Sequence, residues 1–262
     1  MNSPYWQRQT TDQPLFPDIE WSKPEQRSRA GKLGIIGGNK LGFAGVAEAY
    51  STALDSGVGE VRVVLPDALR NTLPAAMTNV VYAPSNPSGS LSQDAINDLR
   101  ALGGWSDCLL LIGDAGRNSQ TAIVYSQLLR DYDRPVVITR DAIDLVRNDS
   151  SMIAARQNTM LILSFAQLQK LFRSLYYPKI LTFSMQLMQL VEALHKFTIT
   201  YPITIATLHQ DTLIAAHSGE VATTPWTDPM RIWRGTVAAR ASAYYTWNPE
   251  RPLEALTASL LK

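Results

Sequence analysis

The sequence predicts a three-layer α/β/α domain with a mostly parallel central sheet and a late antiparallel hairpin. Two observations support this fold class. Short apolar runs such as LGIIG, VRVVL, DCLLLIG, PVVIT and NTMLIL alternate with longer amphipathic segments, which is the pattern of strands covered by helices. The runs are continuously apolar instead of alternating with polar residues, as expected of parallel strands that are buried on both faces.

Each apolar run from Lys32 onward is followed by a segment with helical periodicity. The predicted helices cover residues 44–56, 67–73, 119–131, 141–146, 164–175 and 179–197. After them come ITIAT, DTLIAAH and EVATT, three short strand candidates joined by turn residues, which predict the antiparallel hairpin. Asp228 then suits an N-cap and Pro229 the first position of a helix, so the last helices are predicted to begin there.

Length and charge restrict the class of protein. The chain has 262 residues, which suits a single large α/β domain over 31–262, preceded by a polar, proline-bearing arm over 1–30. It carries 24 basic and 23 acidic residues, too balanced for a nucleic-acid binder. We find neither a signal-peptide pattern nor about 18 consecutive apolar residues, so we expect a cytoplasmic protein without a membrane partner.

Residue types that often carry chemistry have structural interpretations here. Cys108, the single cysteine, lies in an apolar strand and is predicted to be an inert core thiol. His195, His209 and His217 have no metal-ligand spacing or acidic cluster beside them, so no metal site is predicted. Ser164 lacks a Gly-x-Ser-x-Gly context and is predicted to cap a helix.

The stretch IIGGNKLGFAG, residues 35–45, joins a strand to a helix through a glycine-rich loop. Such loops let backbone N–H groups approach an anion closely. The candidate substrate-binding residues are therefore Gly37, Gly38, Asn39, Gly42 and Gly45, with Gly113 and Gly116 of a second loop. A purely structural role in a tight turn remains the alternative for these glycines. The spacing does not match the Gly-x-Gly-x-x-Gly dinucleotide fingerprint.

The stretch LGIIGGNKLGFAGVAEAYSTALDSGVGEVRVVLPD resembles the opening of the ribokinase-like NAD(P)HX dehydratases, the carbohydrate kinase domain of bifunctional NAD(P)HX repair enzymes. LLIGDAGRNSQT is similar to the IGPGLGR segment of that family, and PVVITRDAIDL to its VLDADALNL segment. The resemblance runs from about residue 31 to the C-terminus and weakens along the way. It implies a ribokinase-like fold, and an activity that uses ATP or ADP, with Mg²⁺, to phosphorylate and dehydrate hydrated NADH or NADPH.

The family's catalytic motif is Gly-Gly-Thr-Gly-Asp at a helix N-terminus. Its glycines expose N–H donors to the developing charge, and its Asp takes the proton. The matching stretch, DPMRIWRGTVAARASAYY, places that Asp on Val237 or, shifted by one residue, on Ala238. No carboxylate lies between Asp228 and Glu250, so we assign no catalytic residue by resemblance.

Other motifs of the family have changed too. Its Thr-Pro-His-x-Gly-Glu segment falls on ILSFAQ at 162–167, and the first Asp of DAD falls on Thr139. Gly-Pro-Gly becomes GDA at 113–115, which puts a carboxylate where an anionic ligand would lie, and the lysine of a VLKG strand becomes Thr207. The glycine and strand framework remains while four motifs differ, which predicts loss of catalysis with retention of the fold.

Two arginines in the same region are candidates for a residual phosphate site. Arg231 and Arg234 lie one turn apart near the predicted start of a helix, where positive charge opposes the helix dipole. An exposed face or an ion pair with Asp228 is the alternative. Trp233 stands where the family has glycine and is a candidate to plug the nucleotide pocket. The candidate nucleotide-binding residues are Arg231, Arg234, Gly235 and Thr236.

Three functional hypotheses follow. The first is a non-catalytic homologue of the NAD(P)H-hydrate dehydratases, a pseudoenzyme that keeps nucleotide or dinucleotide binding. The second is an active, divergent dehydratase or small-molecule kinase with Asp141 or Asp114 as the base. The third is a structural or partner-binding protein, because such domains commonly form homo-oligomers and the arm over 1–30 is suited to wrap a neighbouring subunit.

Overall fold

The computed structural model describes residues 3–72 and 77–261. Over these residues the chain forms a ten-stranded sheet in the order β1-β10-β9-β8-β7-β6-β5-β2-β3-β4. The strands are β1 (Trp6–Arg8), β2 (Lys32–Gly37), β3 (Glu60–Pro66), β4 (Val80–Ala83), β5 (Cys108–Gly113), β6 (Val136–Thr139), β7 (Thr159–Leu163), β8 (Thr204–His209), β9 (Thr212–His217) and β10 (Glu220–Pro225). The strands from β4 to β8 run parallel, and β9 pairs antiparallel with β8 and β10, so the predicted fold class is confirmed.

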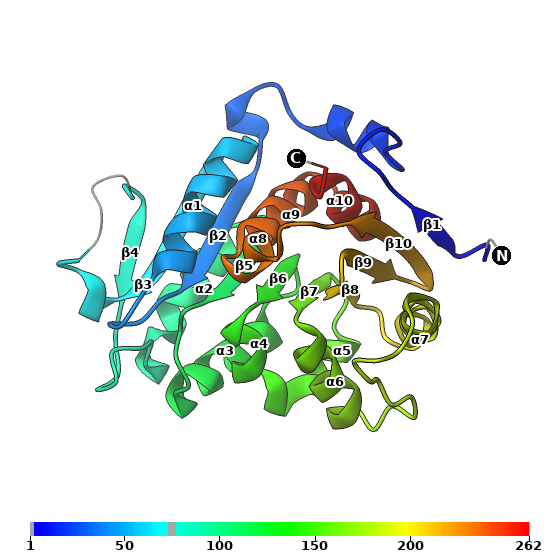
Figure 1. Ribbon diagram of the computed structural model, residues 1–262. Helices are drawn as coiled ribbons and strands as arrows, with labels where there is room; N and C mark the ends of the chain where they lie inside the picture. The colour runs from blue at the N-terminus through cyan, green and yellow to red at the C-terminus, as the bar shows by residue number, and fades with distance from the viewer. Residues whose placement is uncertain (1–2, 73–76, 262) are drawn as a thin grey trace.

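Helices cover both faces of the sheet (Figure 1). They are α1 (Ala44–Ser56), α2 (Ile96–Trp105), α3 (Ser119–Asp131), α4 (Asp141–Leu145), α5 (Ser150–Ala155), α6 (Phe165–Ser174), α7 (Leu187–Thr200), α8 (Pro229–Trp233), α9 (Thr236–Trp247) and α10 (Pro252–Ser259). One layer contains α1, α8, α9 and α10, and the other contains α2 to α7. The predicted helices at 44–56 and 119–131 are confirmed with the bounds expected.

The sheet separates two apolar cores. Residues of β2 alternate between them: Ile35 packs with α1 and α9, and Ile36 packs with α2 and α3. Both side chains are fully buried, and each such burial stabilises the fold by roughly 2 kcal/mol. Because the strands are buried on both faces, the continuous apolar runs of the sequence are explained by packing.

Three helix predictions need correction. The predicted helix over 179–197 begins only at Leu187, where Gln186 and Gln189 form a capping box; residues 179–186 are irregular, with Ile180 and Phe183 82% and 68% exposed. Those two residues therefore do not belong to the buried stripe that the spacing indicated. The predicted helix over 67–73 is a single 3-10 turn over Asp67–Leu69, and position 73 lies outside the described residues. The third correction concerns the helix predicted from Asp228.

That helix is divided into α8 and α9. Gly235, at φ 93°, has a left-handed backbone that glycine adopts without strain, and it separates the two helices. The N-cap prediction is confirmed, because the Asp228 carboxylate accepts a hydrogen bond from the N–H of Met230 at 3.0 Å. Sequence reasoning also missed β4 and α2. The strand β4 is short, and the last turn of α2 contains Gly103 and Gly104, which lower helix propensity.

Residues 3–31 pack against the rest of the same molecule. Strand β1 pairs in parallel with β10, and the indole N–H of Trp6 donates to the Thr223 hydroxyl at 3.0 Å. Further on, the 3-10 helix Pro17–Ser22 packs on α10, and its residue Ile19 is fully buried. Among the described residues, no helix is both long and apolar enough to cross a membrane.

Candidate functional site

The carboxyl ends of β2, β5 and β6 meet at one edge of the sheet, the position where open α/β sheets bind ligands. Gly37 lies opposite Gly113, and the N–H of Gly38 donates to the Gly113 carbonyl at 2.8 Å. A Cβ on Gly37 would lie 2.3 Å from that carbonyl oxygen, so only glycine fits there. The close packing of the two loops explains part of the glycine pattern without any ligand.

The predicted substrate-binding residues do lie together. Asn39 and Gly42 close the loop after β2 with two reciprocal backbone hydrogen bonds of 3.0 Å. The Asn39 side-chain amide donates to the Asp114 carbonyl at 2.6 Å, which ties this loop to the loop after β5. Gly116 lies close to the Asn39 amide, whereas a Cβ on Gly42 would meet open space. Gly42 is therefore the one glycine of the set 37, 38, 42 and 45 that packing does not require.

The Asp114 carboxylate lies at the N-terminus of α1. Its Oδ2 accepts a hydrogen bond from the N–H of Gly45 at 2.6 Å, and its Oδ1 lies 2.6 Å from Nη2 of Arg140. The two side chains are only 17% and 23% exposed, respectively. The glycine-rich loop thus faces a carboxylate of its own chain, and that carboxylate is neutralised by Arg140.

The Asp141 carboxylate is held by the loop after β5. Its Oδ1 accepts from the N–H of Asp114 at 2.7 Å, and its Oδ2 accepts from Ala115 at 3.1 Å and Gly116 at 3.2 Å. Three backbone donors around one carboxylate make a stable nest. Asp141 therefore shapes this loop, and both of its oxygens face backbone amides.

The N-terminus of α9 is apolar at the positions of the family's catalytic Asp. Val237 is 4% exposed and Ala238 is 1% exposed. Both belong to α9 and pack in the apolar core on the α1 and α9 side of the sheet. Gly235, which precedes them, lies against Ile112 and the Arg140 side chain, so the start of α9 adjoins the Asp114–Arg140 pair. Neither position carries a group that can accept a proton.

A carboxylate from another element lies beside this helix start. Glu48, on α1, accepts a hydrogen bond from the Thr236 hydroxyl at 3.2 Å, across 188 residues of sequence. Both side chains lie at the surface. Sequence reasoning searched for a carboxylate only within 228–250 and so missed Glu48. Its position on α1 facing α9 depends on helix packing that no local pattern reveals.

The positions of Arg231, Trp233 and Arg234 differ from those predicted. Since α8 ends at Trp233, Arg231 lies in its last turn and does not oppose a helix N-terminus; its guanidinium lies over the Trp226 ring, 5.4 Å from the centroid. Arg234 is exposed just after the helix. Trp233 is 51% exposed, so the prediction that it plugs the pocket is wrong.

A cationic cleft of about 360 Å³ lies at the N-terminus of α3, beside the Asp141 nest. Arg117, Arg147 and Lys170 line it, together with the start of α3, Asp141 and Asp144. Arg117 is exposed, and among the described residues no ion pair involves it. We call this region the α3 cleft. Sequence reasoning placed Gly116 near a ligand, but it did not bring Arg147 and Lys170 to the same place.

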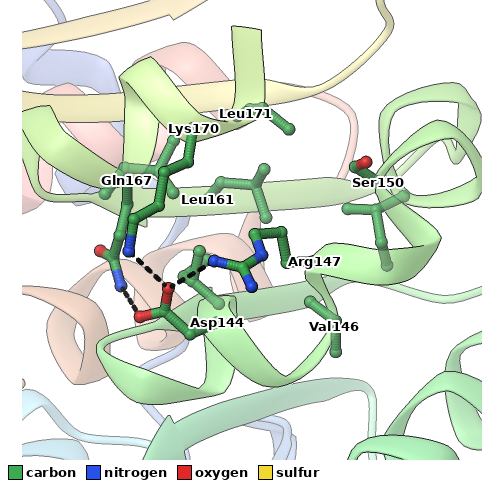
Figure 2. Close-up of a pocket in the computed structure, with 11 residues that line it drawn as sticks. Asp144, Val146, Arg147, Ser150, Leu161, Gln167, Lys170 and Leu171 are labelled. Carbon is green, nitrogen blue, oxygen red and sulfur yellow. Dashed lines mark hydrogen bonds and ion pairs between the residues drawn. The ribbon is translucent and has the colours of Figure 1, made fainter. Parts of the chain in front are cut away.

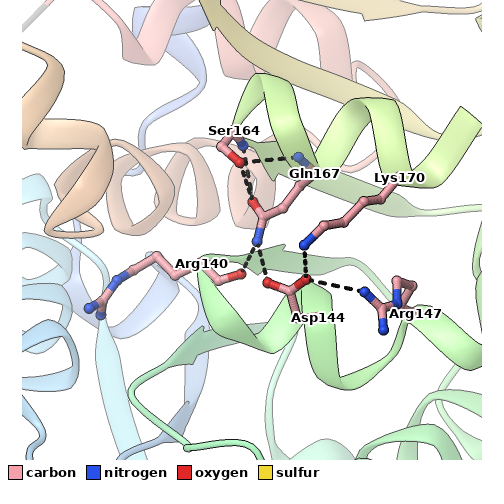
Figure 3. Close-up of polar contacts among 6 residues, drawn as sticks. All are labelled: Arg140, Asp144, Arg147, Ser164, Gln167 and Lys170. Atoms are coloured by element: carbon pink, nitrogen blue, oxygen red, sulfur yellow. Dashed lines mark hydrogen bonds and ion pairs between the residues drawn. The ribbon is translucent and has the colours of Figure 1, made fainter. Parts of the chain in front are cut away.

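Asp144 connects the wall of this cleft to α6 (Figure 3). Its carboxylate accepts from Gln167 Nε2 at 3.0 Å and from Lys170 Nζ at 3.2 Å, with Arg147 Nη1 at 3.9 Å. Gln167 also donates to the Arg140 carbonyl at 2.8 Å and completes a capping box with Ser164, whose predicted N-cap role is confirmed. The network joins the cleft to the backbone of Arg140.

An apolar cavity of about 30 Å³ adjoins the α3 cleft (Figure 2). Leu161, Val146 and Leu171 contribute to its wall, and Asp144, Arg147 and Lys170 border both spaces. This volume is about that of one water molecule, too small for a nucleotide base.

The remaining candidates have structural partners. The Cys108 thiol is fully buried, as predicted, and burial raises its pKa to about 12, so it is a poor nucleophile. His195 stacks on Tyr5, His209 bonds the Met185 carbonyl at 2.9 Å, and His217 bonds the Thr204 hydroxyl at 3.0 Å. Within residues 3–72 and 77–261 we find no group of three His, Cys, Asp or Glu side chains placed to hold a metal ion.

Comparison with known proteins supports the resemblance. No protein-family model matches the chain. A bifunctional NAD(P)H-hydrate repair enzyme Nnr from Moorella thermoacetica is 24% identical over 149 residues, which cover 54% of this chain and 28% of that protein. The match thus spans little more than a quarter of that relative's length.

Solved structures share the architecture. A ribokinase-like superfamily protein from Enterococcus faecalis V583 has a TM-score of 0.75 at 14% identity, covering 100% of this chain and 87% of that one. An ADP/ATP-dependent NAD(P)H-hydrate dehydratase from Bacillus subtilis, co-crystallised with ATP/Mg²⁺ and soaked with CoA, has a TM-score of 0.65 at 12% identity, covering 99% and 87%. At these identities the likeness establishes the fold. The chain therefore has the ribokinase-like fold, and its sequence is related to that of the NAD(P)H-hydrate repair enzymes, as the motifs predicted.

Proposed function

We propose that this protein is a non-catalytic homologue of the NAD(P)H-hydrate dehydratases that binds a phosphate-bearing nucleotide in the α3 cleft. The observation that carries the proposal is the cleft itself, about 360 Å³ in volume and lined by Arg117, Arg147 and Lys170. Its volume falls at the lower end of the range for small-molecule sites. Guanidinium and ammonium groups are the side chains that bind phosphate.

The same geometry argues against phosphoryl transfer. That reaction needs a base at the acceptor hydroxyl, within hydrogen-bond reach of the proton that it removes. The positions of the family's base are buried Val237 and Ala238, and Asp141 already accepts three backbone hydrogen bonds. Asp114 is engaged by Arg140 and the N–H of Gly45. Each carboxylate oxygen of the two aspartates thus already has a hydrogen-bond partner.

Thermal unfolding with ATP, ADP, AMP, NAD, NADH and NADPH tests the binding. A ligand at a hundredfold excess over its Kd should add about 2.7 kcal/mol to the free energy of unfolding, a shift of several degrees. We expect Arg147→Gln/Lys170→Gln to weaken that ligand at least tenfold. The matched control is Arg100→Gln/Lys196→Gln, which removes the same two charges from ion pairs on α2 and α7 and should leave Kd unchanged. Absence of any shift, or equal weakening in both double variants, contradicts the proposal.

One observation favours a second function, an active divergent kinase or dehydratase. Glu48 brings a surface carboxylate to Thr236, the first residue of α9, whose hydroxyl it accepts from at 3.2 Å. A carboxylate in that place is able to take the proton of an acceptor hydroxyl while the helix start stabilises the developing charge. Turnover that is lost in Glu48→Gln and retained in Asp141→Asn would support this function over the first.

A further inference from the structure

The loop over 37–45 already has an anion at its helix N-terminus. Glycine-rich loops that lead into a helix bind phosphate through backbone N–H groups and the helix dipole. In this chain the group at that place is the Asp114 carboxylate, which lies 2.6 Å from the N–H of Gly45 in the first turn of α1. Arg140 approaches the same carboxylate with Nη2 at 2.6 Å.

We propose that Asp114 is an internal ligand: its carboxylate occupies the phosphate position of the loop over 37–45, held there by Arg140. The wild-type loop consequently admits no phosphate, and it becomes a phosphate site when the carboxylate is removed. The inference concerns this loop alone and is independent of the α3 cleft, to which Arg147 and Lys170 belong.

Asp114 and Arg140 both have unfavourable backbone conformations, which orient their side chains toward each other. Asp114 has φ 54° and Arg140 has φ 56° with ψ −139°, conformations that L-residues other than glycine adopt at a cost in free energy. Surrounding contacts hold each of them in place. Asn39 binds the Asp114 carbonyl, Asp141 binds its N–H, and Gln167 binds the Arg140 carbonyl. The chain thus maintains two unfavourable conformations at the ends of neighbouring strands, and the result is one partly buried ion pair.

The guanidinium has a donor that the carboxylate does not use. Nη1 of Arg140 is buried and has no hydrogen-bond partner within the described residues. It lies against Gly45, where an added Cβ would be only 1.6 Å away, so glycine at this position makes room for the arginine. With the carboxylate gone, Nη1, Nη2 and the N–H of Gly45 remain close together. Three donors suit a phosphate dianion, which offers more acceptor oxygens than a carboxylate.

Inorganic phosphate is the probe that tests this assignment. Asp114→Gly removes the carboxylate, and glycine adopts φ 54° without strain. Isothermal titration of that variant should detect one phosphate site, at least tenfold tighter than any phosphate binding of the wild type. Adding Arg140→Gln should abolish the gain, whereas adding Arg100→Gln/Lys196→Gln, which removes two charges from ion pairs on α2 and α7, should leave it unchanged.

Two results would overturn the proposal. One is a folded Asp114→Gly protein, judged by cooperative thermal unfolding, that binds phosphate no better than the wild type. The other is a gain that survives Arg140→Gln, which would place the site elsewhere. Should Asp114→Gly not fold, Asp114→Ala replaces it, because alanine also leaves the phosphate position empty. The same gain is then expected, and a folded Asp114→Ala protein without it would count against the proposal equally.

Discussion

Asp141→Ala is expected to lower the free energy of unfolding by about 3 kcal/mol, because the N–H groups of Asp114, Ala115 and Gly116 would lose the carboxylate that accepts their hydrogen bonds. Asp141→Asn should cost about 1 kcal/mol less, since its remaining oxygen satisfies part of the nest. Urea unfolding followed by circular dichroism measures both differences, as shifts of the midpoint at constant m-value.

The matched control is Asp55→Ala, which removes an exposed carboxylate from α1 and should change the free energy of unfolding by no more than about 0.5 kcal/mol. A stable Asp141→Ala protein would contradict the structural role of Asp141. The result also separates two functions for this residue, because a base could be replaced by asparagine with loss of turnover and little change in stability.

Gly113→Ala is the second change with a large expected effect, again about 3 kcal/mol of destabilisation. Gly113 has φ 92°, which alanine adopts only with strain. Its Cβ would also lie 2.1 Å from Asp141 Oδ1, inside the nest. The control is Gly42→Ala, where the new Cβ meets open space, and here we expect a change within about 0.5 kcal/mol.

Both glycines were predicted to contact substrate, so this pair distinguishes a structural glycine from a loop glycine that remains available to a ligand. Thermal and urea unfolding of the two variants provide the measurement. Equal destabilisation by the two substitutions would mean that packing at Gly113 does not set the geometry of the loop after β5.

The sheet and the helices beside the site could be predicted because their signals are local. Continuous apolar runs locate β2, β5, β6 and β7, and the expected helices at 44–56 and 119–131 have the bounds found. The glycine positions likewise predicted that the loops after β2 and β5 would approach each other. Parallel strands end at the same edge of a sheet, so motifs at their carboxyl ends must meet there.

The polar side-chain contacts within the site could not be predicted, because they depend on tertiary packing. Glu48 reaches Thr236 only because α1 packs on α9, and Arg140 reaches Asp114 only because β5 and β6 are neighbours. The hydrogen bond between Gln167 and Asp144 was likewise not predicted, because the two residues lie 23 positions apart on different helices. Pairing them required the contact between α4 and α6.

The irregular segment over 179–186 shows the limit of periodicity. Its Ile180 and Phe183 follow helical spacing, yet both are mostly exposed, and the helix starts at the capping box of Gln186. A three-to-four spacing of apolar residues describes one face of a helix only when a partner buries that face.

The most direct test of the account is a turnover assay with hydrated NADH, ATP or ADP and Mg²⁺, following NADH absorbance and nucleotide hydrolysis together. With buried Val237 and Ala238 at the positions of the base, we predict rates equal to those without protein, for the wild type and for Glu48→Gln alike. Turnover above that background by the wild type, abolished in Glu48→Gln and kept in Asp141→Asn, would contradict the account and identify an active enzyme with a carboxylate displaced to α1.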